Sequence, residues 1–285
     1  MAQQAEKGEA RIKDHQDHEI VSLRVIDDQH EDVKEETIRM FKCLLVKYSS
    51  YFAAVFQVPG VQVPGVSEMT LHCGLHEFQG FMQFLKFQHK RDLKNGTTQH
   101  LDWDLTEYNV TCKLFELETP LYDDFTEYRQ LIRGGVDFYF FADRYMIPRL
   151  RQDATDRILW ALVQGCDHHY DWNELVPSHM LEEIYLVEAS SYTLHEVFIN
   201  GFDAFSYDIA QGSTEHISQA LSKHMSTLST LPKEFLDDVL EHYRHRAKMI
   251  VPTCSQMLET LEPCDYHDHE NTSERQQCEG SRVRW

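Results

Sequence analysis

Apolar and polar residues alternate along two short segments near the start of the chain. Residues 20–26 (IVSLRVI) place Val21, Leu23 and Val25 on one face, and residues 37–41 (TIRMF) alternate in the same way. A period of two predicts strands that bury one face. The charged stretch between them is typical of a turn, so the two strands are expected to form a hairpin. A third strand is expected over residues 69–72.

Residues 41–56 (FKCLLVKYSSYFAAVF) predict two short helices placed back to back. The first is an apolar turn that contains Leu44 and Leu45 and ends at Tyr48. Ser49 then offers its side-chain oxygen to the free backbone N–H groups of the second helix. The apolar residues of this second helix fall at helical spacing: Tyr51, Phe52, Val55 and Phe56. This segment is expected to act by packing.

Longer helices follow with the apolar spacing of amphipathic segments. The first covers residues 75–87, a second is apolar nearly all round over 136–142, and Pro148 suits the first turn of a third. One face of this third helix carries Leu150, Ala154, Ile158 and Leu162. Residues 175–205 predict more helix, with apolar faces at Leu181, Ile184, Tyr185, Leu194, Val197 and Phe198. A last helix within 231–250 is expected to bury Phe235, Leu236, Val239, Leu240 and Tyr243.

Several stretches lack this periodicity. Residues 1–19 and 251–285 predict a disordered arm and a disordered tail, and the tetrapeptide Val-Pro-Gly-Val occurs twice in a turn-rich loop after Phe56. The sequence HKRDLKNGTTQ, residues 89–99, predicts a polar loop. It belongs to an expected insertion over residues 88–130.

Composition and charge narrow the class of protein. The chain has 285 residues, of which 42% are hydrophobic, which suits a folded protein with a core. Its net charge of −20 repels a phosphate backbone, so nucleic-acid binding is not expected. No apolar run approaches the roughly 20 residues of a membrane span, and the polar N-terminus is not a signal peptide. We therefore expect an intracellular protein, cytoplasmic or nuclear, that does not bind membranes. Its seven cysteines, without a CxxC pair, are expected to be reduced thiols.

Candidate chemistry is sparse. The nearest approach to a metal site is the tail set of Cys264, His267, His269 and Cys278. A solvated His-rich tail explains this set better than a zinc site, because the ligand pairs are unequal and no apolar residues surround them. The same holds for His168 and His169 beside Asp167 and Asp171. No GxSxG, P-loop, GxGxxG or HExxH motif occurs. We expect no catalytic residue, cofactor or metal, and an enzyme with an unrecognised site is the less favoured alternative.

Two segments resemble the BTB/POZ family. The family pattern of a strand, His-Lys, two leucines and Ser-x-x-Phe is similar to residues 41–56, where Phe41 replaces the His and is expected to be a plain packing residue. The matching residues are Lys42, Leu44, Leu45, Ser49, Tyr51 and Phe52. The family's Ala-Asp-x-Tyr-x-Ile-Pro-x-Leu helix pair is matched by Ala142, Asp143, Tyr145, Ile147, Pro148, Leu150 and Ala154. The later helices resemble those of BTB proteins abundant in filamentous fungi.

The resemblance implies an α+β fold, with a short mixed sheet capped by helices over residues 20–165 and a helical extension over 166–250. It also implies a protein–protein interaction module that forms homo- or hetero-dimers. The implied dimer interface contains Val21, Leu23, Val25, Leu44, Leu45 and Tyr48. As an alternative, the resemblance implies a substrate adaptor of a cullin-based ubiquitin ligase, with a hydrophobic-x-Glu motif at Val66 and Glu68. The implied cullin contact consists of Val66, Glu68, Tyr51 and Phe52.

Overall fold

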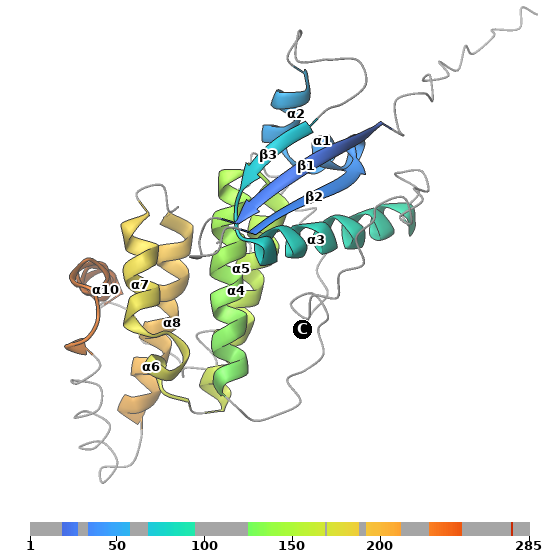
Figure 1. The fold of residues 1–285 in the computed structure, drawn as a ribbon. Coiled ribbons are helices and arrows are strands. Elements are labelled where there is room, and N and C mark those ends of the chain that lie inside the picture. Colours follow the sequence, from blue (N-terminus) through green and yellow to red (C-terminus); the bar gives the residue numbers. More distant parts are fainter. Residues whose placement is uncertain are drawn as a thin grey trace, which may run out of the picture. The chain divides into compact units, whose positions relative to one another are not determined.

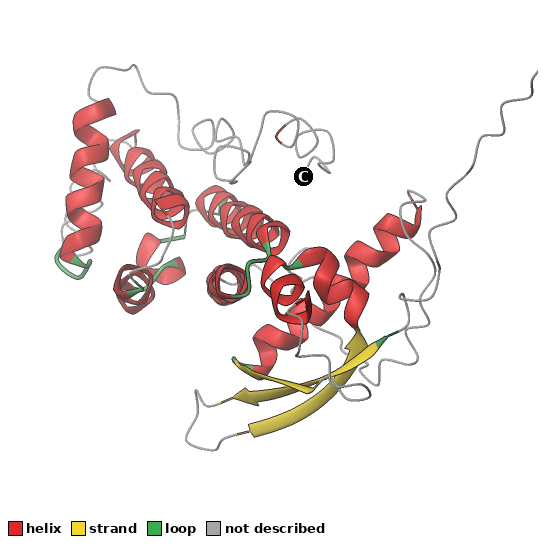
Figure 2. Cartoon of the chain, turned by 90° about the horizontal axis from the view of Figure 1, so that it is seen from above, coloured by secondary structure: helices red, strands yellow, loops and turns green. Residues whose placement is uncertain are grey.

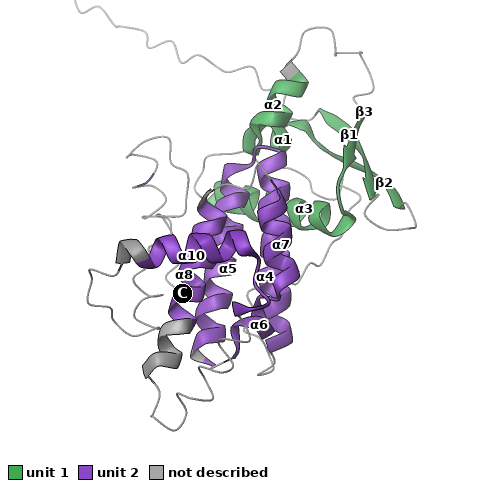
Figure 3. Cartoon of the chain, turned by 90° about the vertical axis from the view of Figure 1, so that its left-hand side faces the viewer, with its two compact units in different colours: residues 1–110 green, residues 111–285 purple. Residues whose placement is uncertain are grey.

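A computed structural model of the chain describes residues 19–27, 34–57, 68–94, 125–168, 170–187, 192–211, 228–246 and Arg275. The fold is mixed α+β, mostly helical with a small three-stranded sheet (Figures 1 and 2). The chain divides into two compact units, Met1–Val110 and Thr111–Trp285, which Figure 3 colours separately. Each unit is described by itself below.

The sheet of the first unit has the strand order β2-β1-β3. Strand β1 (Ile20–Asp27) pairs antiparallel with β2 (Lys34–Phe41) and parallel with β3 (Glu68–His72). In this register Leu23 lies opposite Ile38 on one side and Met69 on the other. The three strands expected from the alternating pattern are therefore confirmed.

Helices cover the apolar face of this sheet. The side chains of Val21, Leu23 and Val25 are fully buried, while the residues between them on β1 are only half-buried. Helix α3 (Leu75–Lys94) packs against β1, α1 (Lys42–Tyr48) packs against α3, and α2 (Ser50–Gln57) follows α1 directly. These helices lie on one side of the sheet (Figure 2). The sheet has a single apolar face because its strands alternate.

The junction between α1 and α2 confirms two expectations. The backbone N–H of Phe52 donates a hydrogen bond to Ser49 Oγ over 3.1 Å, so Ser49 stabilises the start of α2 as a side-chain cap. Phe41, at the end of β2, is buried in the core. It acts as a packing residue, as the sequence predicts.

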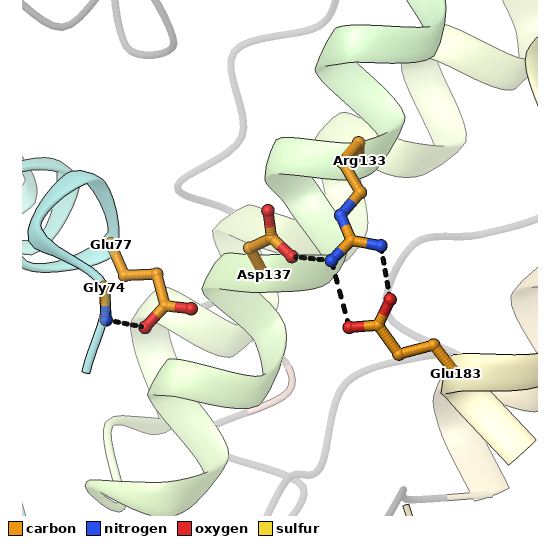
Figure 4. A network of polar contacts seen from close by, with 5 residues as sticks. All are labelled: Gly74, Glu77, Arg133, Asp137 and Glu183. Carbon is orange, nitrogen blue, oxygen red and sulfur yellow. Dashed lines mark hydrogen bonds and ion pairs between the residues drawn. The ribbon is translucent and has the colours of Figure 1, made fainter. Parts of the chain in front are cut away.

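Helix α3 is longer than the sequence predicts. Residues 89–94 continue the helix, so the prediction of a polar loop from His89 is wrong for them. The helix continues because Gln88 and His89 turn inward and are almost fully buried. Two carboxylates stabilise its N-terminus. Asp27 accepts a hydrogen bond from the N–H of Leu75 over 3.1 Å. Glu77 accepts one from the N–H of Gly74 over 3.1 Å (Figure 4).

The second unit is helical throughout its described residues. Helices α4 (Phe125–Arg144) and α5 (Pro148–Asp167) pack along each other, and α5 also packs against α8 (Tyr192–Gln211). The short helix α6 (Trp172–Leu175) contacts α4. Helix α10 (Lys233–Arg246) packs against α8 and against α7 (Ser178–Leu186).

The α4–α5 pair follows the predicted pattern. Pro148 lies in the first turn of α5, and the predicted inner face of α5 is buried: Leu150, Ala154, Ile158 and Leu162. Between the helices, Met146 has a left-handed backbone with φ of 48°. The N–H of Ile147 donates to the carbonyl of Ala142 over 2.7 Å, which ends α4 at this turn.

Helices α4 and α5 belong to the second compact unit, and the expected division near residue 165 stays a prediction. Helices α4 and α5 share one core with α6, α7, α8 and α10, in which Ile132, Ile158 and Phe198 are fully buried. Residues 125–130, which the sequence assigns to an insertion, form the first turns of α4. Residues 95–124 lie outside the described residues.

Helix α10 is a second departure from the sequence prediction. Phe235 and Val239 are buried as expected, and Leu236 is partly buried against the core. Leu240 is 54% exposed and Tyr243 is 37% exposed, so the prediction that α10 buries them is wrong. The apolar residues of α10 occupy a wider face of the helix than the part that packs against the described core.

Several further predictions meet the described residues only in part. Cys43 and Cys73 are not in disulfides, whereas Cys166 is disulfide-bonded, so the prediction of reduced thiols is wrong for Cys166. The Val-Pro-Gly-Val loop, both terminal segments (apart from Glu19 and Arg275) and the Cys264–Cys278 set lie outside the described residues. Within those residues no cluster of three metal-binding side chains occurs. No described helix has the length and apolarity to cross a membrane.

Candidate protein-interaction surface

Five of the six residues implied for a dimer interface form the interior of the first unit. Val21, Leu23 and Val25 on β1 are fully buried, and so are Leu44 and Leu45 on α1. These side chains stabilise the unit by packing in its interior. Because they are fully buried, they have no exposed surface left with which to contact a second chain. Tyr48, the sixth residue, is only half-buried.

The surface of α1 and α2 is formed by the neighbours of these buried residues. In a helix, residues next to an inward-facing pair project to its flanks. On α1 these flanking positions hold apolar side chains, and α2 adds others. Five half-buried residues define what we call the α1–α2 surface: Cys43, Val46, Tyr48, Val55 and Phe56. Tyr51 and Ala53 of α2 are half-buried as well. The resemblance implied Tyr48 as an interface residue, but the sequence analysis did not single out the other four residues of this surface. It selected the most apolar positions, and these are in the core.

A polar contact anchors α1 to α3 at one end of this surface. Asp92 accepts hydrogen bonds from Lys47 Nζ and from the Tyr48 hydroxyl, each over 2.5 Å. Burial alone raises the pKa of the Asp92 carboxyl, but the bonds from Lys47 and Tyr48 outweigh it and hold that pKa below its usual value. The Tyr48 ring also packs edge-on against Phe84, with ring centroids 6.0 Å apart. Tyr48 is thus held in one orientation at the surface.

A second cation lies at the other end of α1. Lys42 Nζ forms an ion pair of 2.9 Å with Glu19 and lies 5.4 Å from the centroid of the Phe56 ring. The α1–α2 surface therefore has apolar side chains between two lysines, Lys42 and Lys47. An apolar centre with a charged rim is typical of protein–protein contacts.

The four residues implied for a cullin contact are not equally accessible. Phe52 is fully buried and stacks on Phe81 with ring centroids 6.2 Å apart. Tyr51 is half-buried, and Glu68 is exposed at the start of β3. Val66 lies outside the described residues. The cullin contact stays a prediction, with Glu68 and Tyr51 as its accessible described members.

In the second unit, one polar network joins α4 to α7. Arg133 forms a two-pronged ion pair with Glu183 and a 3.0 Å ion pair with Asp137, one turn further along α4 (Figure 4). The hydrogen bond with Glu183 is the largest cause of the raised pKa of Arg133. The charged groups satisfy one another, so this network serves to hold the helices together.

A second network joins α7, α8 and α10. The Tyr185 hydroxyl donates to Asp238 on α10 over 2.9 Å, and the Tyr185 ring stacks on His195 of α8 with centroids 4.1 Å apart. Burial raises the pKa of the Tyr185 hydroxyl and lowers the pKa of His195. Both shifts favour neutral groups, which suits a packed junction between helices.

Comparison with known proteins identifies no relative. No protein-family model matches the chain, and no curated protein or solved structure is significantly similar to it. The case for a function therefore depends on the residues and contacts described above.

Proposed function

We propose that the chain is a protein–protein interaction module with a BTB/POZ-like first part, and that it dimerises through the α1–α2 surface. The observation that carries this proposal is the group of half-buried apolar side chains on two adjacent short helices, α1 and α2. Lys42 and Lys47 of α1 accompany them. Contact with another polypeptide would remove these side chains from water, which is the main source of association free energy.

Two features of the chain support the BTB/POZ-like part of the proposal. Residues 41–56 and 142–154 carry the sequence resemblance. The order of elements also agrees with it, because a hairpin of β1 and β2 leads directly into a helix with two adjacent leucines, Leu44 and Leu45. In this proposal the helices after residue 165 form the extension that brings in a partner.

The size of the α1–α2 surface limits what it does alone. A stable interface buries roughly 800 Å² on each partner. Two helices of 7 and 8 residues supply the centre of such an interface and require neighbouring surface around them. We therefore expect a dimer that dissociates on dilution.

Sedimentation velocity of the full chain over about two decades of concentration tests the proposal. The sedimentation coefficient of the wild type should rise with concentration. Val46→Glu places a charge within the α1–α2 surface while keeping a good helix former. This variant should weaken the dimer about ten-fold or more.

The matched control is Thr37→Glu, which places the same charge at an exposed position on β2. It should associate like the wild type. Both variants should retain the wild-type thermal unfolding midpoint within a few degrees, since neither position is in the core. Equal association of Val46→Glu and the wild type would contradict the proposed surface.

A further inference from the structure

Helix α10 carries two parallel rows of side chains. The inner row, Phe235 and Val239, is buried in the core of the second unit. The second row, which we call the α10 stripe, consists of Leu236, Leu240 and Tyr243, of which Leu240 is 54% exposed and Tyr243 37% exposed. The described fold thus uses one row and leaves much of the other in solvent.

The contacts of the inner row fix the rotation of α10 about its axis. The Phe235 ring packs against Trp172, Phe202 and Tyr185, with centroid distances of 6.4, 5.5 and 6.0 Å. Asp238 accepts the hydrogen bond from the Tyr185 hydroxyl, and Nε2 of His242 lies 3.4 Å from Oδ2 of Asp203 on α8. Turning α10 to bury Leu240 would break these contacts, so the exposed stripe follows from the packing of the helix.

The spacing of the α10 stripe is that of a helix–helix seam. Leu236, Leu240 and Tyr243 are separated by four and then three residues, the alternation that keeps apolar side chains on one line of a paired helix. A partner that fits this line is another amphipathic helix. The remaining question is which helix it is.

The charges of α10 favour a second copy of the same helix in antiparallel orientation. In the sequence of α10, the first half is net acidic, with Glu234, Asp237 and Asp238 against Lys233, and the second half is net basic, with Arg244 and Arg246 against Glu241. Antiparallel pairing places the acidic half of each copy beside the basic half of the other, whereas parallel pairing places like charges together. We propose that α10 pairs antiparallel with α10 of a second copy of this chain through the α10 stripe.

The contact is separate from the α1–α2 surface and independent of the proposed function. A chain with both surfaces forms assemblies larger than a dimer. Three side chains from each copy bury much less than a standard interface, so the α10 contact is weak by itself and gains strength when another contact already joins the copies.

Four full-length proteins test the proposal: the wild type, Leu240→Glu, Val46→Glu and the double variant. Their masses are measured by light scattering over about two decades of concentration, in about 0.15 M salt to screen the large net charge. The wild type should exceed a dimer at the highest concentrations. Each single variant should reach a dimer at most, and the double variant should remain a monomer.

The comparison separates the two surfaces. If Leu240→Glu lowers association and Val46→Glu does not, the α10 contact stands and the proposed function is wrong. If Leu240→Glu changes association in neither background, the α10 contact is overturned. That result is also expected if another part of the same chain covers the stripe.

Two further variants control for folding and for orientation. Leu240→Met keeps an apolar side chain and should associate like the wild type, which links the loss in Leu240→Glu to the apolar contact. Asp237→Lys reverses an exposed charge beside the stripe and should weaken association about three-fold or more. Glu182→Lys, an equal change on the exposed face of α7, should not. Equal effects of the two lysine substitutions would overturn the antiparallel pairing.

Discussion

Gly135 shows how closely α4 and α5 approach each other. A Cβ atom at this position would lie 2.6 Å from Cγ1 of Ile158, which is fully buried and has no room to move. In a free helix, Gly→Ala gains about 1 kcal/mol. Here overpacking should outweigh that gain, so we predict that Gly135→Ala lowers the free energy of unfolding by about 1–3 kcal/mol. Denaturant unfolding measures the loss.

The control for Gly135→Ala is the same change in an Ile158→Ala background. Removing the Ile158 side chain costs stability by itself, but it also removes the atoms that the new Cβ would meet. In that background Gly135→Ala should be neutral or stabilising, and the double-mutant cycle should show strong coupling. A stabilising Gly135→Ala in the wild type would mean that the helices are further apart than described.

His195 makes the second unit sensitive to acid. Burial lowers the pKa of His195 below its ordinary value of 6.5, and this effect outweighs the attraction of Asp238. Above pH 6.5 the residue is neutral in the folded and unfolded chains. As the pH falls below 6.5, the unfolded chain takes up the proton first, so stability is lost until the pH passes the lower folded pKa.

We therefore predict that His195→Phe, which retains an aromatic ring against Tyr185 but does not titrate, loses less stability on acidification than the wild type. Urea unfolding between about pH 7 and pH 5 measures both proteins, and the other histidines contribute equally to each. A steeper loss in His195→Phe would contradict the assigned direction of the pKa shift.

At the residue scale, the sequence predicts what local chemistry determines. Ser49 was identifiable as a helix cap because Ser offers an oxygen at the start of an apolar helical pattern, and Phe41 was identifiable as a packing residue. Leu240 was not predictable, because its apolarity indicates a contact without identifying the surface that makes it. Val46 lies within the helix expected at the dimer interface but was not singled out, since its more apolar neighbours Leu44 and Leu45 dominate the pattern.

At the scale of elements, the turn between α4 and α5 carries local strain. Met146 has φ of 48°, a conformation that costs a residue with a Cβ about 1 kcal/mol, and its side chain is 57% exposed. Met146→Gly should remove this cost, and the greater freedom of glycine in the unfolded chain offsets part of the gain. We predict a net stabilisation of about 0.5 kcal/mol, measured by denaturant unfolding.

Met146→Val provides the comparison for this prediction. Its branched Cβ is unfavourable in the left-handed region, so the variant should be less stable than the wild type. If Met146→Gly is instead destabilised, the Met146 side chain makes a contact that outweighs the strain.

The sequence predicted the type of the longer helices and of the strands better than their ends, and it did not predict the short helix α6. Helix α3 continues to Lys94 because tertiary packing buries Gln88 and His89, two polar residues that end the apolar pattern. The disulfide at Cys166 was equally unpredictable, because the sequence alone does not show which cysteines lie close together. The extent of α3 depends on tertiary contacts, which a local pattern does not contain.

At the scale of the whole molecule, the second compact unit contains α4 and α5 together with the later helices. The resemblance joins α4 and α5 to the preceding sheet, whereas their apolar faces share a core with the later helices, including Phe198 and Phe235. A pattern within one helix shows that it has an apolar face, but it does not show which other face covers it. Units defined by packing were therefore not predictable from periodicity.

If the chain associates with a second copy through the α1–α2 surface, its mass in solution must depend on concentration. Light scattering of the full chain at rising concentration measures that mass. We expect it to approach at least twice the 33.6 kDa of one chain, and we expect Val46→Glu to lower it. A wild type that remains at 33.6 kDa throughout the range would show that the proposed association does not occur.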